Sequence, residues 1–420
     1  MRVCLISPGH LSTNPRLVKE AHALRAAGHT VHVVCGRFKA WGTVNDAPLA
    51  AEIGSVTFVP FGPEEAPRLT YFSQNITRHA ARCLVRFGLN LQSLVEAAHN
   101  PVGRDLTAAA RNVCADLYIA HYVAALPAAA HAARRHNAAY AFDAEDFHLG
   151  DLPDAPEHAL ERYIIRAIES RYLHGTAYMT AASPLIAEAY AETYRVSPPT
   201  VILNVFPKAN APATPCTRGS AEPGPSLYWF SQTIGPDRGL ETAVEAIARA
   251  QSLPHLYLRG TPAAGYEACL RSFAARASVA DRLHFLDPVP PDQLERLGAS
   301  YDLGYVGECD VTPNRLRALT NKLFSYLIGG VPSLATDIPA HRHLAPQLGE
   351  AMTLFPIGDA AALAAAMDRL LLDPQRLAAA RSQAWHLGQT RFNWDVERSK
   401  MASIINRVAM QSNQQHLRNN

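Results

Sequence analysis

Short apolar runs alternate with amphipathic helical segments along this chain, and no other feature restricts its fold as strongly. The first cycle runs from an apolar stretch at Val3–Ile6, through STNPRLVKEAHALRAAG, to a second apolar stretch at Thr30–Val34. Asn14 is suited to cap the amino terminus of the intervening helix, and Pro15 suits its first turn. Gly28 is suited to end the helix. This order of strand, helix and strand predicts an α/β domain with a parallel sheet.

The alternation continues, stops once and starts again. Further apolar runs lie at 116–122, 139–148, 177–183 and 200–206. The next segment, PKANAPATPCTRGSAEPGP, is rich in proline and small residues and cannot form a core element. A new series then begins with SLYWFSQ. We therefore expect two α/β domains, with ligands bound at the carboxyl ends of their strands in a cleft between them. The predicted boundaries are 1–206 for the first domain, 207–225 for the linker and 226–390 for the second domain.

The carboxyl end of the chain has a different pattern. RFNWDVERSKMASIINRVAM, residues 391–410, predicts a terminal helix anchored by Trp394. The last segment, QSNQQHLRNN at 411–420, has little to bury and predicts a frayed tail.

Composition excludes several classes of protein. The chain has 420 residues, enough for two domains, and its 39 basic and 37 acidic residues give no electrostatic case for nucleic acid. The seven cysteines include no C-x-x-C pair, which favours a reducing compartment. The apolar run at the amino terminus is too short for a signal peptide, and none approaches the ~18 residues of a membrane span. We expect a cytoplasmic protein, at most peripheral on the inner face of the membrane.

One joint between a helix and a strand is unusual, in LTNKLFSYLIGGVPSLATD at Leu319–Asp337. Thr320, Asn321 and Lys322 open a predicted helix, whose free N–H groups and positive dipole end suit a diphosphate. Ordinary helix capping explains the same residues. Physical reasoning on this motif alone leaves both interpretations open.

Five segments in order resemble the GT-B-fold glycosyltransferases, in particular the retaining family 4. They are HLSTNPRLVKEAHALRAAGHTVHVV, ADLYIAHYVAALPAAA, AASPLIAEAYAETY, SQTIGPDRGLETAVEAIA and TNKLFSYLIGGVPSLATDIPAHRHL. The resemblance implies two Rossmann-like domains facing across a cleft, with the acceptor on the first and a nucleotide-diphosphate sugar on the second. It also implies a terminal helix that crosses back to the first domain, no cofactor and no bound metal.

The resemblance also implies roles for individual residues. The donor-binding residues would be Gly235, Arg238, Glu308, Thr320, Asn321, Lys322 and Ser325. The residues near the reaction centre would be His121, Arg238 and Lys322. The residues on the acceptor side would be Gly9, His10, Asn14, Arg16 and Glu145. Arg238 could equally be a solvated turn residue, Asn14 a helix cap, and His121 an incidental member of the 18 histidines.

Two positions depart from the family pattern. Ser325 stands where the family usually has a glutamate that binds the nucleotide ribose, and Arg317 where a second glutamate is often found. A serine hydroxyl cannot replace a charged bidentate acceptor. Donor identity, or activity itself, is therefore in question, and Glu308 is a candidate substitute for the missing carboxylate.

Two further clusters have more than one interpretation. Asp143, Glu145, Asp146 and His148 in DAEDFH resemble a site for a hard cation, although an acid/base or structural role is equally compatible. In YFSQNITRHAARCLVRFGLNL, arginines recur at every fourth position beside apolar residues. If the segment is a helix, its basic stripe suits an anionic membrane or a lipid-linked acceptor, while a core-facing helix with a solvated arginine face is the alternative. These arginines are Arg78, Arg82 and Arg86.

The sequence favours a glycosyltransferase of glycan or cell-envelope polysaccharide biosynthesis. It would move a sugar from a nucleotide-diphosphate donor to a glycan or lipid-linked acceptor, with retention at the anomeric carbon. The alternatives are a nucleotide-sugar epimerase or phosphorylase of the same fold, or a catalytically silent subunit that binds a partner or glycan. A dinucleotide-dependent dehydrogenase is disfavoured because neither half has G-x-G-x-x-G after its first strand.

Overall fold

The computed structural model describes residues 1–215, 224–309 and 312–419, with the side chains of 411–419 left aside. The chain divides into two compact units: unit 1 comprises Met1–Ile202 and Arg398–Asn420, and unit 2 comprises Leu203–Glu397. Residues 216–223 of the predicted linker lie outside the described part. In the described ranges, no helix has the length and apolar content needed to cross a membrane.

Unit 1 is built on a parallel sheet with the strand order β3-β2-β1-β4-β5-β6-β7. Its strands are β1 (Arg2–Ser7), β2 (Thr30–Arg37), β3 (Val56–Pro60), β4 (Leu117–His121), β5 (Ala139–Ala144), β6 (Met179–Ala181) and β7 (Thr200–Val201). Its helices are α1 (Pro15–Ala26), α2 (Ala40–Ile53), α3 (Arg68–Arg86), α4 (Gln92–His99), α5 (Gly103–Arg111), α6 (Ala125–His136), α7 (Ala159–Tyr172), α8 (Pro184–Tyr194) and most of α16 (Trp394–Asn419).

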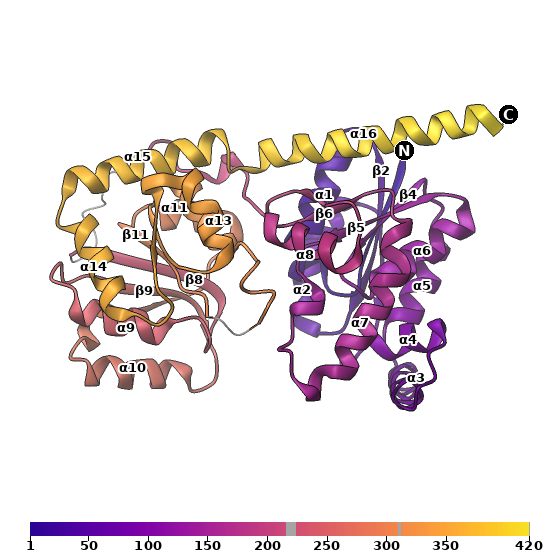
Figure 1. Cartoon of the computed structure of the whole chain (residues 1–420), viewed down its shortest axis with the longest axis horizontal. Helices are drawn as coiled ribbons and strands as arrows, with labels where there is room; N and C mark the ends of the chain where they lie inside the picture. Colours follow the sequence, from indigo (N-terminus) through magenta and orange to yellow (C-terminus); the bar gives the residue numbers. More distant parts are fainter. Residues whose placement is uncertain (216–223, 310–311, 420) are drawn as a thin grey trace. The chain divides into compact units, whose positions relative to one another are not determined.

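Alternation along the strands explains why both faces of this sheet are covered. Val3 and Leu5 point into a core formed with α1 and with Ile405 and Val408 of α16, whereas Cys4 and Ile6 are buried on the other face. Figure 1 shows α1 and α2 on one side of the sheet and α5 and α6 on the other. The terminal helix thus contributes to the core of unit 1, as the family resemblance implied.

Unit 2 repeats the architecture with the strand order β10-β9-β8-β11-β12-β13. Its strands are β8 (Ser226–Ile234), β9 (His255–Pro262), β10 (Leu283–Leu286), β11 (Leu303–Val306), β12 (Ser333–Thr336) and β13 (Met352–Phe355). Its helices are α9 (Leu240–Arg249), α10 (Tyr266–Arg276), α11 (Leu294–Gly298), α12 (Asn321–Gly329), α13 (Pro339–Leu348), α14 (Ala360–Leu371) and α15 (Pro374–Thr390). Figure 1 shows α9 and α10 on one side of β8 and β9, and α11, α13 and α15 on the other.

Both sheets reverse their strand order beside the first strand of the unit. In unit 1 the first strand pairs with β2 on one side and β4 on the other, and in unit 2 β8 pairs with β9 and β11. The chain therefore winds outward in both directions, and the loops after these central strands leave the sheet on opposite sides. The two parallel sheets confirm the predicted pair of Rossmann-like domains.

Some predicted boundaries differ from the observed ones. Unit 2 begins at Leu203, a few residues before the predicted linker, and helix α16 is helical as far as Asn419. Residues 411–419, predicted to fray, therefore continue the intrahelical hydrogen bonding that the preceding turns start. Helix α1 follows its sequence signals, since the Asn14 side chain accepts a hydrogen bond from the Leu17 amide at 3.0 Å and Pro15 is its first residue.

Candidate functional site

The reversal of strand order in unit 2 brings two loops together. The loop at 235–239 follows β8, and the loop that starts at Gly307 follows β11, its neighbour in the sheet. Because both strands are parallel, these loops emerge at the same edge, which is where open α/β sheets bind their ligands.

Close contacts hold the first loop against β11. The Tyr305 hydroxyl donates to the Gly239 carbonyl at 2.6 Å. Gly239 has φ 64, and a Cβ there would lie 2.8 Å from the Tyr305 hydroxyl, so both conformation and space require glycine. Arg315 donates to the Asp237 carbonyl at 2.7 Å from the segment before α12. The loop is therefore fixed from two sides.

Among the described residues, three cations and one carboxylate converge beside this loop. Arg238 Nη1 lies 4.0 Å from Glu308 Oε2, and Lys322 Nζ lies 5.1 Å from the centre of the Trp229 ring. Arg315 is close enough to act electrostatically on Lys322. We call Arg238, Arg315, Lys322 and Glu308 the cation cluster. Its positive charge exceeds its negative charge, which is typical of an anion site.

The protonation of Lys322 reflects this imbalance. Loss of water contact is the main cause that lowers the pKa of the Lys322 ammonium. Glu308 raises that pKa, but Arg238 and Arg315 lower it again. An anion placed among the three cations would therefore favour the charged form of Lys322.

The amino terminus of α12 adds backbone N–H groups to the same place. Thr320 is the N-cap residue in an extended conformation, yet within the described residues its side chain makes no capping hydrogen bond. The first amides of α12 are thus not capped by a side chain, and the helix dipole favours an anion in front of them. Gly330, at φ 69, ends the helix in the left-handed conformation, as the Gly-Gly pair predicts.

Several of the predicted donor residues are therefore neighbours. Arg238, Glu308 and Lys322 lie together, with Thr320 and Asn321 at the helix start beside them. Gly235 lies in the first loop, but a Cβ there would meet only ordinary contacts at 3.8 Å, so its backbone does not require glycine. Sequence reasoning missed Arg315, although its signal, a basic residue shortly before the helix, was present in TPNRL.

The Ser325 side chain is bound to a neighbouring helix. It is buried, and its hydroxyl donates to Glu295 Oε1 at 3.1 Å, while Asn210 donates to Glu295 Oε2 at 3.2 Å. This hydrogen bond is directed to a carboxylate on α11, and the donor contact of Ser325 stays a prediction. The other departure, Arg317, donates to the Pro313 carbonyl at 2.8 Å.

Unit 1 gathers a second charged group at the corresponding edge of its sheet. Arg16 Nε and Nη2 bind Asp143 at 2.5 and 2.8 Å, and Arg16 Nη1 donates to the Ile202 carbonyl at 2.7 Å. His121 Nε2 lies 2.9 Å from Glu20 Oε2, and its Nδ1 lies 3.3 Å from Asp143 Oδ2. We call these residues, Arg16, Glu20, His121 and Asp143, the buried ion network.

Each charge in the buried ion network has a partner. Burial by itself would raise the pKa of the Asp143 carboxyl. The charge and hydrogen bonds of Arg16 act in the opposite direction, and the pKa of Asp143 lies below its ordinary value. Burial is likewise outweighed at His121, whose pKa is raised by the hydrogen bond to Glu20 and the charge of Asp143. Burial raises the pKa of the neighbouring Glu145 carboxyl, with Asp146 and Asp143 adding to the shift. The catalytic role of His121 and the acceptor role of Arg16 and Glu145 remain predictions.

The loop after β1 is held mainly by bonds within the protein. His10 is completely buried, its Nδ1 lies 2.7 Å from Asp46 Oδ2, and its Nε2 accepts from the amides of Phe38 and Lys39 at 3.1 and 3.0 Å. Both ring nitrogens therefore have partners within unit 1, and the acceptor role of His10 stays a prediction. Asn14 caps α1, as its alternative interpretation held, and the Gly9 amide donates to the Ser7 hydroxyl at 3.3 Å.

The acidic segment after β5 does not assemble a metal site. Among the described residues, no three His, Cys, Asp or Glu side chains are arranged to hold an ion. Asp143 is bound to Arg16, whereas His148 Nδ1 lies 2.8 Å from the Tyr190 hydroxyl, which donates to Glu169 at 2.7 Å. Asp143 and His148 are therefore each held by partners from other segments.

The arginines of α3 also differ from expectation. Arg78 Nε donates to the His99 carbonyl at 3.2 Å, and Arg82 Nη1 binds Glu161 at 2.5 Å and the Ala98 carbonyl at 3.3 Å. Arg86 alone of the three is exposed. The predicted basic stripe is therefore not a solvent-facing surface, because two of its members satisfy groups of α4 and α7.

Comparison with known proteins supports the same assignment of fold. The sequence model of the glycosyl transferase 4-like domain matches residues 13–204, whereas a sequence search of curated proteins finds no match. Anabaena HepE, solved with UDP, superposes with a TM-score of 0.70 at 17% identity, over 97% of this chain and 100% of that one. Sucrose-phosphate synthase from Thermosynechococcus elongatus superposes with a TM-score of 0.69 at 16% identity, over 98% of this chain and 100% of that one. WaaG, a glycosyltransferase involved in lipopolysaccharide biosynthesis, superposes with a TM-score of 0.56 at 14% identity, over 96% of this chain and 99% of that one.

These likenesses extend over nearly the whole of each chain, and they agree with the two parallel sheets and their strand order. Residues 13–204 match the model of the glycosyl transferase 4-like domain, and the chain has the GT-B fold of two Rossmann-like units.

Proposed function

We propose that this protein is a glycosyltransferase that takes its sugar from a nucleotide-diphosphate donor bound to unit 2. The observation that carries the proposal is the cation cluster in front of the uncapped start of α12. Three cations, one carboxylate and free helix amides suit a group with two adjacent phosphates. The family model that matches residues 13–204 and the fold of the chain agree with this activity.

The cluster residues would have distinct roles in the transfer. As the bond between sugar and phosphate breaks, negative charge grows on the departing diphosphate. The Arg238 guanidinium can pair with two phosphate oxygens, and Lys322 supplies a further positive charge whose protonated form the anion would favour. The amides at Asn321 and Lys322 add fixed donors that need no reorganisation. Glu308 would orient Arg238 rather than bind phosphate, because like charges repel.

The acceptor and the stereochemistry are further parts of the proposal. We infer a glycan or lipid-linked acceptor and retention at the anomeric carbon, in a cytoplasmic enzyme that needs no cofactor. HepE is solved with UDP and glucose, and WaaG is described as an enzyme of lipopolysaccharide biosynthesis. These descriptions favour a uridine nucleotide and a cell-envelope glycan for this chain.

Ser325 favours a second candidate, a silent subunit that keeps the fold without the reaction. The carboxylate that the family usually has at this position is missing, and the serine is turned to Glu295. A donor would then lose a charged contact to its ribose, worth about 1.5–3 kcal/mol. Such a subunit would bind nucleotides weakly or not at all.

A nucleotide screen separates the two candidates. Thermal unfolding would be followed with UDP, GDP, ADP and CMP, and turnover by release of sugar from the matching nucleotide sugars. A ligand at a hundred times its dissociation constant should stabilise the protein by about 2.7 kcal/mol. Stabilisation by one nucleoside diphosphate together with sugar transfer supports the enzyme. Nucleotide binding without turnover, or no response to any nucleotide, supports the silent subunit.

A further inference from the structure

A polar hollow of about 500 Å³ lies between helices α3, α4 and α5 of unit 1. Gln74 of α3 lines it and donates to the Pro60 carbonyl at 3.3 Å. Since Pro60 is the last residue of β3, the hollow lies toward the carboxyl edge of the sheet, the edge at which His121 ends β4. We call this space the α3–α5 hollow.

One wall of the α3–α5 hollow is a row of hydroxyl groups. Thr70, Ser73 and Thr77 line it from α3, and their spacing by three and four residues places them on one side of the helix. A hydroxyl on a helix often donates to a carbonyl of the preceding turn, as Thr107 of α5 does to Gly103 at 2.8 Å. In the described part of the chain, the three hydroxyls of α3 have no such partner. They can therefore both donate to a ligand and accept from it.

The facing wall supplies an amide, a cation and a carboxylate. Asn100 Oδ1 accepts from the Val102 amide at 3.0 Å, and Asp105 Oδ2 accepts from Gln74 Nε2 at 2.6 Å. Within the described ranges, Asn100 Nδ2, Asp105 Oδ1 and the exposed Arg104 guanidinium have no protein partner. The wall thus offers two donors and one acceptor side by side, which suits a ligand with adjacent hydroxyl groups.

Gln74 has one unsatisfied group beneath the hollow. Its side chain is 7% exposed, and among the described residues its Oε1 has no hydrogen-bond partner. Its Nε2 donates to Asp105 and to the Pro60 carbonyl, so a reversed amide would place the oxygen against two acceptors. A buried acceptor without a partner points to a donor from outside the protein, such as a hydroxyl group or a bound water.

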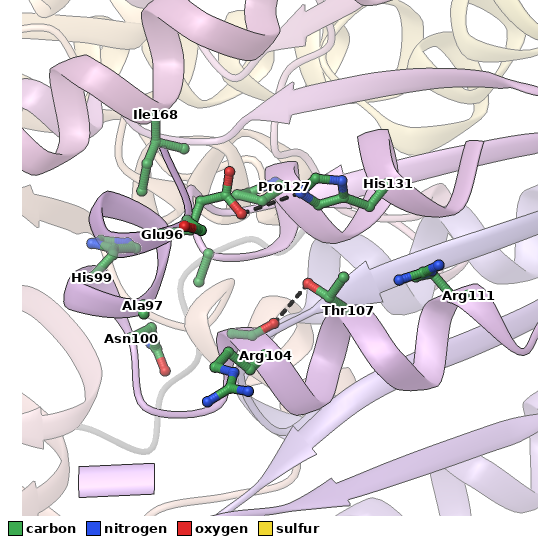
Figure 2. A pocket seen from close by; sticks show the side chains of 13 residues that line it. Glu96, Ala97, His99, Asn100, Arg104, Thr107, Arg111, Pro127, His131 and Ile168 are labelled. Atoms are coloured by element: carbon green, nitrogen blue, oxygen red, sulfur yellow. Dashed lines mark hydrogen bonds and ion pairs between the residues drawn. The ribbon is translucent and has the colours of Figure 1, made fainter. Parts of the chain in front are cut away.

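A second hollow of about 250 Å³ adjoins the first at Asn100 and Arg104, which line both. Figure 2 shows these two residues on one side of it and Glu96 and His131, whose side chains pair with each other, on another. The buried Ile168 adds an apolar group to its lining. The two hollows together have room for a ligand of more than one ring, with both polar and apolar surface.

The charge of the α3–α5 hollow is balanced. Among the described residues that line it, Arg104 is the one cation and Asp105 the one carboxylate. Neither an anion nor a cation is therefore favoured, in contrast to the cation cluster of unit 2. An apolar ligand would remove water from the hydroxyl and amide groups without replacing their hydrogen bonds. A neutral ligand that carries many hydroxyl groups meets both conditions.

We propose that the α3–α5 hollow binds a neutral carbohydrate and that the chain of a glycan continues into the second hollow. The hydroxyls of α3 exchange hydrogen bonds with sugar hydroxyls, Asp105 accepts from them, and Asn100 and Arg104 donate to them. A sugar hydroxyl, or a water that it retains, donates to Gln74. The site is built from unit 1 alone, so it goes beyond the proposed transfer reaction and does not depend on it.

Saturation-transfer NMR on the full-length protein tests the proposal. The probes are maltotriose, cellotriose and β-1,4-galactotriose in phosphate-free buffer, each with and without UDP, and sodium phosphate serves as an anion probe. We expect at least one trisaccharide to bind equally well with and without UDP, and phosphate not to displace it. Ser73→Ala combined with Arg104→Ala changes two exposed residues and should weaken binding about tenfold.

A pair of substitutions at one position separates hydrogen bonding from shape. Thr77→Val keeps the shape but removes the hydroxyl, and it should weaken trisaccharide binding about fivefold. Thr77→Ser keeps the hydroxyl and should bind like the unaltered protein. The matched control is Arg86→Ala, an exposed position of the same helix that lines neither hollow, and it should also leave binding unchanged. Unchanged thermal unfolding of the variants shows that their fold is intact.

Three results would overturn the proposal: no trisaccharide binds, the double variant binds as tightly as the unaltered protein, or phosphate displaces the saccharide. Affinity for UDP, which the proposed function assigns to unit 2, should be the same in all these variants. A failure of saccharide binding with normal UDP binding would therefore remove the carbohydrate site and leave the proposed function standing. Saccharide binding without any nucleotide binding would do the reverse.

Discussion

The two units place charged side chains at the same edge of similar sheets, but they treat these charges in opposite ways. In unit 1, Arg16 and His121 each face carboxylates, so the buried ion network is complete without a ligand. In unit 2, among the residues that the structure describes, Arg238, Arg315 and Lys322 share one carboxylate, Glu308. The first arrangement holds a structure together, and the second is complete only when an anion is added.

This comparison shows how a binding site can be distinguished from a structural ion cluster of similar composition. Both clusters follow the central strands, both contain arginine, and both were expected from the sequence to serve the substrate. The balance of charge distinguishes them. Substitutions in the buried ion network should therefore cost stability, whereas substitutions in the cation cluster should cost ligand affinity.

The largest effect is expected for Asp143→Asn in unit 1. The change leaves the Arg16 guanidinium buried beside a neutral group, and breaking such a pair costs about 3–5 kcal/mol in the free energy of unfolding. Urea denaturation measures it. Glu267→Gln, in the exposed pair with Arg271 at 2.8 Å, is the control and should change stability by less than about 0.5 kcal/mol. Equal effects of the two substitutions would show that the buried ion network stabilises the fold no more than an exposed ion pair does.

The next effect concerns pH and also belongs to unit 1. Burial opposes protonation of His148, but its contact with Glu169 raises the pKa of His148 to about 9. A folded pKa above the unfolded value of about 6.5 gives stability that is complete below pH 6.5 and is lost as pH rises through 9. We expect a loss on the order of 3 kcal/mol over that range. In His148→Gln this part of the pH profile should be flat. A profile identical to that of the unaltered protein would refute the assignment.

Arg238→Ala tests unit 2 in the opposite sense. Removal of one charged contact to phosphate should weaken nucleoside diphosphate binding by about ten- to a hundredfold, measured by titration calorimetry. The free energy of unfolding should change by less than about 0.5 kcal/mol, because Arg238 is partly exposed and its nearest carboxylate oxygen is 4.0 Å away. Arg249→Ala, on the outer face of α9, should leave the affinity unchanged. A large loss of stability without loss of affinity would show that Arg238 is structural.

The smallest effect is expected at Ser325. Ser325→Ala removes the hydrogen bond to Glu295 but leaves that of Asn210, so the cost should be about 1 kcal/mol in unfolding free energy. Nucleotide affinity should not change, since the hydroxyl points to α11. A weaker nucleotide affinity at unchanged stability would place Ser325 in the donor site after all.

Local sequence signals predicted much of the fold. Asn14 and Pro15 start α1, Gly330 ends α12, and the apolar runs at Val3–Ile6 and 116–122 lie in central strands. Each of these features is set by neighbours in sequence, such as a cap, a turn conformation or an alternating pattern. The strand β3 was not predicted, because VTFVP is short and lies at the edge of the sheet.

The orientation of side chains could not be predicted in the same way. The spacing of Arg78 and Arg82 places them on one side of a helix, but only Glu161 and the carbonyls of α4 decide that this side faces inward. The partner of Ser325 is Glu295, thirty residues earlier on another helix. Arg315 joins the cation cluster through a loop whose position follows from packing. Such contacts depend on tertiary structure rather than on local pattern.

The central claim is that the cation cluster and the start of α12 bind a diphosphate. A crystal structure of the protein with UDP tests it most directly. We predict the two phosphates within hydrogen-bonding distance of Arg238, Lys322 and the first amides of α12. A nucleotide bound elsewhere, or with its phosphates turned away from these groups, would contradict the account.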